Sequence, residues 1–171
     1  KQGSYTKMYE KFGAHPMTHK GKKGVHFAVW APNAKSVCVR GDFNDYKIDA
    51  HPLQLRSDDS GIWEGFIEDI AIGLTYKYHI VSLFHNIVHE KSDPFAFYSE
   101  VAPKSASRIY ELDNYKWNDK KWMQKRHNFN AHDAPVSVYE MHVGSWRRNP
   151  EEDNRYLTSK ELAVELVPYL K

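Results

Sequence analysis

The sequence has 171 residues, 41% of them hydrophobic and 14% aromatic, which excludes a disordered chain because enough apolar surface exists for a core. The net charge is only +2, with basic and acidic residues interspersed, so no nucleic-acid partner is expected. A single cysteine, Cys38, excludes an intrachain disulfide and is typical of a reducing compartment, so we expect a cytoplasmic protein. No apolar run reaches the roughly 20 residues that span a bilayer, so no membrane association is expected.

Residues 1–23 predict a short helix followed by a loop. Ser4 is a suitable N-cap, Gly13 can end the helix, and Lys20–Lys23 form a basic loop. The first residue is a lysine rather than methionine, so we expect a cut N-terminus. The apolar residues at helical spacing are Tyr5, Met8, Tyr9 and Phe12.

Residues 24–113 have an apolar period of two, which is typical of strands. Val25, Phe27 and Val29 are expected to point into a core, as are Tyr76 and Tyr78 further along. Turn signals recur about every 8–12 residues, which indicates an antiparallel, immunoglobulin-like β-sandwich. The expected strands are residues 24–30, 36–40, 53–55, 62–67, 75–80 and 106–112.

Residues 114–135 read as an irregular or briefly helical connector, and residues 136–171 as the start of a second fold. Pro135–Val143 predicts a strand, and Thr158–Lys171 predicts an amphipathic helix that Thr158 and Glu161 cap. A strand, a loop and a helix form the first unit of a βα repeat, which cannot bury its own apolar faces. We therefore expect residues 137–171 to pack on the sandwich, to pair between chains, or to be disordered.

Seven motifs follow one another along nearly the whole chain: GVHFAVWAPNA (24–34), GDFNDY (41–46), GIWEGFI (61–67), YKYHI (76–80), SDPFA (92–96), YKWNDKKWM (115–123) and VYEMHVGSWRR (138–148). In this order they resemble the N-terminal part of bacterial 1,4-α-glucan branching enzymes. The segment after the predicted strand, Gly144–Trp146, favours this family over related debranching and trehalose-releasing enzymes.

The resemblance implies a family 48 carbohydrate-binding module, followed by the first strand and helix of a glycoside hydrolase family 13 (β/α)₈ barrel. It implies that the parent protein transfers an α-1,4-glucan segment to a 6-hydroxyl and so makes the α-1,6 branches of glycogen. The retaining reaction needs a carboxylate nucleophile and a carboxylic acid, which the family places on later barrel strands. We therefore expect no catalytic residue here and an inactive fragment, with Glu140 in a structural role. No cofactor or metal site is expected.

Binding of α-1,4-glucan is expected through Tyr46 and Lys77, because the resemblance places glucan-contacting residues at these two positions. The alternation of residues also points Lys77 away from Tyr76 and Tyr78. Trp63 is a third candidate, either as part of an aromatic platform or as a core residue. The family usually has tryptophan where this chain has Tyr46, which weakens the expectation of sugar binding.

Other functions remain open from the sequence. The chain can be a stand-alone glycogen-binding or regulatory module, a purely structural sandwich, or the N-terminal part of a debranching or trehalose-releasing enzyme. The βα unit at residues 137–171 favours the enzyme fragment, because a binding module alone has no use for it. The expected partners are then α-glucan and the barrel domain, with self-association through residues 137–171.

Overall fold

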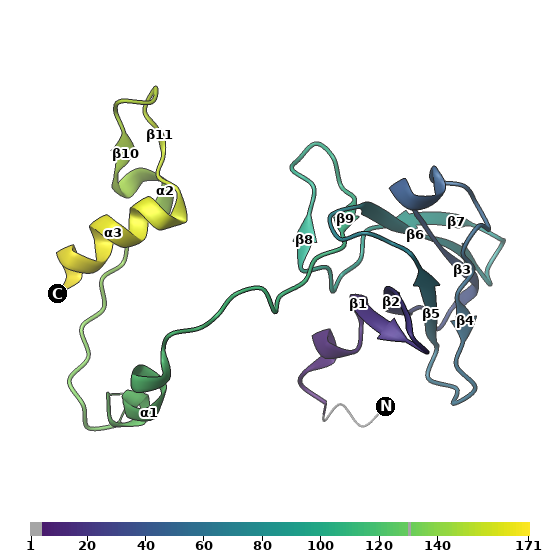
Figure 1. The fold of residues 1–171 in the computed structure, drawn as a ribbon, viewed down its shortest axis with the longest axis horizontal. Coiled ribbons are helices and arrows are strands. Elements are labelled where there is room, and N and C mark those ends of the chain that lie inside the picture. Colours follow the sequence, from purple (N-terminus) through teal and green to yellow (C-terminus); the bar gives the residue numbers. More distant parts are fainter. Residues whose placement is uncertain (1–4, 130) are drawn as a thin grey trace. The chain divides into compact units, whose positions relative to one another are not determined.

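The computed structural model describes residues 5–129 and 131–171, so the predicted cap Ser4 lies outside the described residues. The chain forms two compact units, Lys1–Lys116 and Trp117–Lys171. Figure 1 draws the first as a β-rich body and the second as short helices and a small hairpin. Within the described ranges no helix is both long and apolar enough to cross a membrane.

The first sheet of the β-rich unit is antiparallel and has the strand order β1-β2-β5-β4. Its central strand β2 has the predicted alternation, since Val25 and Phe27 are fully buried while Trp30 is exposed. The predicted inward face of β2 is therefore confirmed. The strands are β1 (Gly13–His19), β2 (Lys22–Trp30), β4 (Gln54–Leu55) and β5 (Ile62–Glu68).

The second sheet is also antiparallel, with the order β3-β6-β9-β8 and β7 paired to β6. Val37, Val39, Tyr76 and Tyr78 are buried, as their alternation predicts. The strands are β3 (Ala34–Gly41), β6 (Thr75–Ser82), β7 (Val88–Lys91), β8 (Tyr98–Ser99) and β9 (Ser107–Arg108). The predicted strand over 106–112 is thus only two residues long, and β8 was not predicted.

The inner faces of the two sheets form the core, so the prediction of a mainly β, immunoglobulin-like sandwich is confirmed. The Phe27 and Tyr76 rings meet edge-on with their centroids 5.2 Å apart. Both Tyr76 and Tyr78 are fully buried, and each donates its hydroxyl proton to one carboxylate oxygen of Asp93, at 2.7 and 2.9 Å. Burial raises the pKa of the Asp93 carboxyl and holds the pKa of both tyrosines above the usual range.

The N-terminal prediction was wrong in part. The helix is one turn of 3-10 helix, η1 (Met8–Glu10), and the segment after it is strand β1 rather than loop. Pro16 argued against predicting a strand here, because proline has no backbone N–H to donate to a neighbouring strand and occurs in sheets only at their edges. β1 is such an edge, and it pairs with β2 alone.

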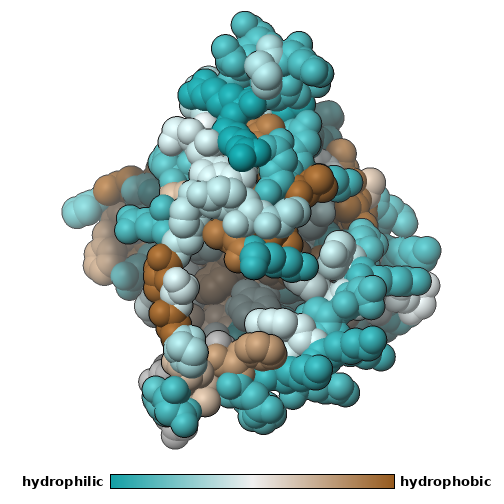
Figure 2. Space-filling view, turned by 90° about the vertical axis from the view of Figure 1, so that its left-hand side faces the viewer, coloured by the Kyte–Doolittle hydropathy of each residue, from teal (hydrophilic) through white to brown (hydrophobic). Residues whose placement is uncertain are grey.

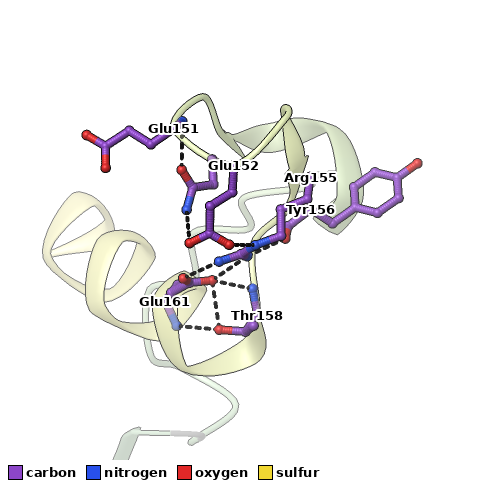
Figure 3. A network of polar contacts seen from close by, with 7 residues as sticks. Glu151, Glu152, Arg155, Tyr156, Thr158 and Glu161 are labelled. Atoms are coloured by element: carbon purple, nitrogen blue, oxygen red, sulfur yellow. Dashed lines mark hydrogen bonds and ion pairs between the residues drawn. The ribbon is translucent and has the colours of Figure 1, made fainter.

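The second unit contains α1 (Lys120–Phe129), α2 (Val143–Trp146), the hairpin β10 (Arg148–Asn149) and β11 (Arg155–Tyr156), and α3 (Ser159–Leu170). The predicted C-terminal helix and its capping box are confirmed. The Thr158 hydroxyl accepts from the Glu161 amide, and the Glu161 carboxylate accepts from the Thr158 amide. Arg155 closes the network with two 2.9 Å bonds to Glu161 (Figure 3).

The predicted strand over Pro135–Val143 is absent from the described part of the chain. Residues 135–142 form neither strand nor helix, and Val143 begins α2. A buried parallel strand is stabilised by ladders to its neighbours, and the described residues offer this segment no such neighbour. Val136 and Val138 are consequently 78% and 86% exposed.

Replacing Asp93 by alanine should destabilise the sandwich strongly, because two buried tyrosine hydroxyls lose their acceptor. We expect a loss of about 2–4 kcal/mol in the free energy of unfolding, measured by urea denaturation. The control is Asp113→Ala, since Asp113 is exposed. A cost for Asp93→Ala equal to that of the control would contradict the role given to Asp93.

Protonation of the Glu161 carboxylate in acid should weaken the N-terminal cap of α3. Hydrogen bonds from Arg155, and then from Thr158, lower the pKa of Glu161 from 4.5 to about 2. Because the folded pKa is the lower one, the stabilisation is complete above pH 4.5 and is lost as the pH falls through about 2. Carbon chemical shifts of α3 should show this loss in the wild type and in Glu151→Gln, but not in Glu161→Gln. An α3 that keeps the same helicity from pH 5 to pH 2 would refute the assignment.

Candidate functional site

The candidate site is the outer face of the second sheet, here called the β6 face. It comprises residues whose side chains point away from the core: Arg40 of β3, Thr75, Lys77 and His79 of β6, Glu90 of β7, and Tyr46. Arg40 and Lys77 are direct cross-strand neighbours, and so are His79 and Glu90. Residues far apart in the sequence therefore meet on one face.

A tight turn after β3 places Tyr46 on the β6 face. The turn is the 3-10 helix η2 (Asp42–Asn44), in which the Asn44 side chain accepts from the Gly41 amide and donates to the Val39 carbonyl. Gly41 is required, because a Cβ there would lie 2.2 Å from the Thr75 carbonyl oxygen. Asp42 does more than shape the turn, since its carboxylate accepts from the Thr75 amide at 2.7 Å.

Tyr46 is fixed between the two strands of the site. Its hydroxyl is 2.5 Å from the hydroxyl of Thr75, and its carbonyl accepts a hydrogen bond from Arg40. The side chain is half-buried, and Thr75 lies buried beneath it. The ring is therefore held in one place at the start of β6, which favours a preformed contact surface.

Lys77 lies next to this contact. It is two residues along β6 from Thr75, and its ammonium donates to the hydroxyl of Ser105 at 2.9 Å. The structure thus brings Tyr46 and Lys77 together around Thr75 and Arg40. Sequence reasoning did not single out Arg40, although its place one residue after the inward-pointing Val39 already implied an outward direction.

Opposite charges balance each other further along the β6 face. One oxygen of Glu90 is 2.5 Å from both Arg40 and the imidazole of His79, which is itself buried. Arg40 therefore contacts both Glu90 of β7 and the carbonyl of Tyr46. An oxygen acceptor and several N–H donors stand close together, a set that can bind hydroxyl groups.

Trp63 does not belong to this face. It lies on β5 in the other sheet, is only 8% exposed, and packs in the hydrophobic core with its indole nitrogen donating to the Ala31 carbonyl. Its prediction as a glycan contact is therefore corrected to the core alternative. The reason is the alternation of side chains along β5: Trp63 is four residues from the buried Ile67, so both side chains point to the inner face of the sheet.

Glu140 is exposed within residues 135–142, so the carboxylate predicted to lie in mid-strand belongs to no strand. Among the described residues, no three His, Cys, Asp or Glu side chains are arranged to hold a metal ion.

The structure is thus an immunoglobulin-like β-sandwich that presents aromatic, basic and hydroxyl side chains on one outer sheet face. The sequence model of carbohydrate-binding module 48 (isoamylase N-terminal domain) matches residues 11–96. The chain therefore belongs to the family of carbohydrate-binding module 48.

Relatives named 1,4-alpha-glucan branching enzyme GlgB match the whole chain. It is 47% identical to that of Aquifex aeolicus over 171 residues, which are 100% of this chain and 27% of the relative. It is 51% identical to that of Halothermothrix orenii, over 99% of this chain and 26% of the relative. The resemblance to branching enzymes is confirmed, and the chain spans about a quarter of their length.

Solved structures of pullulanase share part of the arrangement. One is the Klebsiella pneumoniae pullulanase complexed with maltotriose, with 28% sequence identity and a TM-score of 0.48, over 60% of this chain and 10% of that one. Another is the pullulanase from Bacillus acidopullulyticus, with 21% identity and a TM-score of 0.46.

Replacing Gly41 by alanine should displace the turn that carries Tyr46. The added methyl would collide with the Thr75 carbonyl and with the Phe43 ring, 2.6 Å away. We expect a loss of about 1–3 kcal/mol in the free energy of unfolding and shifted amide resonances at Tyr46 and Thr75. Ser36→Ala, an exposed position on the same strand, is the control. Unchanged resonances at both residues would disprove the requirement for glycine.

Proposed function

We propose that this chain is the glucan-positioning part of a 1,4-α-glucan branching enzyme. The proposal is supported by relatives of that name, which match nearly the whole chain while extending to about four times its length. Such an enzyme transfers an α-1,4-glucan segment to a 6-hydroxyl group, and retaining transfer needs two carboxylates on opposite sides of the scissile bond. In this proposal both carboxylates lie in the part of the enzyme that this chain does not span, and the chain alone is inactive.

The domain organisation is part of the proposal. The sandwich, predicted at 24–113 and extended by β1 back to Gly13, is the binding module, and residues 136–171 become the first strand and helix of a (β/α)₈ barrel when the barrel supplies the neighbouring strand. Exposed apolar side chains in the second unit support this, because a barrel would cover them: Val136, Val138, Val143, Val164, Val167 and Leu170. On the face drawn in Figure 2, hydrophobic side chains reach the surface among hydrophilic ones. In the absence of the barrel, the same residues can support self-association.

We propose that α-1,4-glucan binds on the β6 face. The observation that carries the proposal is the convergence of Tyr46 and Lys77, since Arg40, the strand partner of Lys77, also donates to Tyr46. A sugar ring can stack on the tyrosine while its hydroxyl groups bond with the lysine and with Thr75 or Ser105. The ligand class follows from the family, whose name is that of a carbohydrate-binding module.

A purely structural module is the second candidate. Tyr46 and Lys77 already have partners within the chain, Thr75 and Ser105, so both side chains could serve only to hold loops against β6. In that case the sandwich braces the barrel and has no affinity for sugar.

A cytoplasmic location completes the proposal, supported by the free and buried thiol of Cys38.

Titration with maltoheptaose separates the two candidates. We expect Tyr46→Ala and Lys77→Ala each to weaken binding about tenfold, because each removes a stacking surface or a charge-assisted hydrogen bond. Isothermal titration calorimetry of the 171-residue chain measures the dissociation constant. The control is Lys160→Ala, an exposed lysine of α3 in the other unit. No binding by the wild type would favour the structural candidate, whereas wild-type binding by both variants would show that the sugar binds away from the β6 face.

A further inference from the structure

A groove lies on the first sheet, on the side of the sandwich opposite the β6 face. Its volume is 490 Å³, within the range of about 300–1,000 Å³ that is usual for small-molecule sites. Strands β1, β2, β4 and β5 all line it, and every lining residue belongs to the β-rich unit. The groove therefore rests on a rigid sheet and is complete within the sandwich.

The aromatic residue of the groove is Phe66, and a glycine makes room for it. Phe66 is the direct partner of His26 on the outer face of the sheet, and its side chain is half-buried. A Cβ on Gly24 would lie only 2.7 Å from the Phe66 ring, so the ring lies over this glycine. The His19 ring also contacts Phe66, with the ring centroids 5.3 Å apart, so the two rings together present an aromatic surface on which an apolar sugar face can pack.

Polar groups of both signs stand beside this ring. Arg56 is 3.4 Å from Glu64, and the His26 imidazole is 3.8 Å from the same carboxylate. Carboxylate oxygens only accept and guanidinium nitrogens only donate, whereas a sugar hydroxyl does both. Adjacent hydroxyl groups can therefore bond with Glu64 and Arg56 together.

The charges in the groove favour an uncharged ligand. Arg56 pairs with Glu64 inside the groove and with Asp58, 3.1 Å away, outside the lining, so an anion or a cation would meet a like charge beside each opposite one. Burial lowers the pKa of His26, which keeps the imidazole neutral at pH 7 and able both to donate and to accept. Gln54, next along the groove, adds a neutral amide with the same double capacity.

We propose that this groove is a second oligosaccharide site, in which Phe66 stacks on a glucose ring and Glu64 and Arg56 bind its hydroxyl groups. The identity of the ligand as α-glucan rests on the function proposed above, whereas the site itself is independent of the β6 face. The module then holds glucan on both of its outer faces.

The test is a titration of the isotopically labelled 171-residue chain with maltoheptaose, followed through amide resonances. We expect two separate groups of shifted amides, one on β2 and β5 and one on β3 and β6. Glu64→Gln and Phe66→Ala should each weaken binding in the groove, seen on β2 and β5, about three- to tenfold and leave binding on the β6 face unchanged. Lys77→Ala should do the reverse, and Glu68→Gln, an outer-face carboxylate beyond the groove, should change neither.

The possible results distinguish the two sites. Shifts on β3 and β6 alone would contradict the proposed groove site and support binding on the β6 face. Shifts on β2 and β5 alone would support the groove site and contradict binding on the β6 face. An absence of shifts on both sheets would overturn both. Should Phe66→Ala fail to fold, Glu64→Gln and Arg56→Gln decide, since both side chains lie at the surface of the groove.

Discussion

The sandwich depends on one buried carboxylate. Asp93 accepts from two tyrosines of β6, and its own backbone amide donates to the hydroxyl of Ser107 on β9. It therefore ties the segment after β7 to strands β6 and β9 of the second sheet. The core could not otherwise accommodate two buried phenol groups, because each would lack an acceptor. This anchor also orients Lys77, the residue between Tyr76 and Tyr78.

The alternation of residues along the strands sets which side chains lie on the two outer faces. Each inward tyrosine, valine or phenylalanine fixes the outward direction of the residue beside it. On β6 this gives Thr75, Lys77 and His79, and on the first sheet it gives His26 and Phe66. The two surfaces argued above to bind sugar are therefore consequences of the same alternation that forms the core.

The sequence was sufficient for the sandwich, for the inward residues of β2, β3 and β6, and for the capped helix α3. It was insufficient where structure depends on partners distant in the chain. β1 contains a proline and has no alternation of its own, so only its pairing with β2 makes it a strand. Residues 135–142 have strand propensity but no neighbouring strand among the described residues. The groove was not predicted for the same reason, because Arg56, Glu64 and Phe66 come together only when β4 pairs with β5.

The two edges of the first sheet are poor templates for recruiting another chain. Pro16 interrupts the donors of β1, and β4 at the opposite edge is only two residues long. Both edge strands of this sheet therefore disfavour edge-to-edge pairing with the strand of another chain. Crowding of many copies around one polymer, as a module with several sugar contacts would experience, should leave the sandwiches separate and correctly folded.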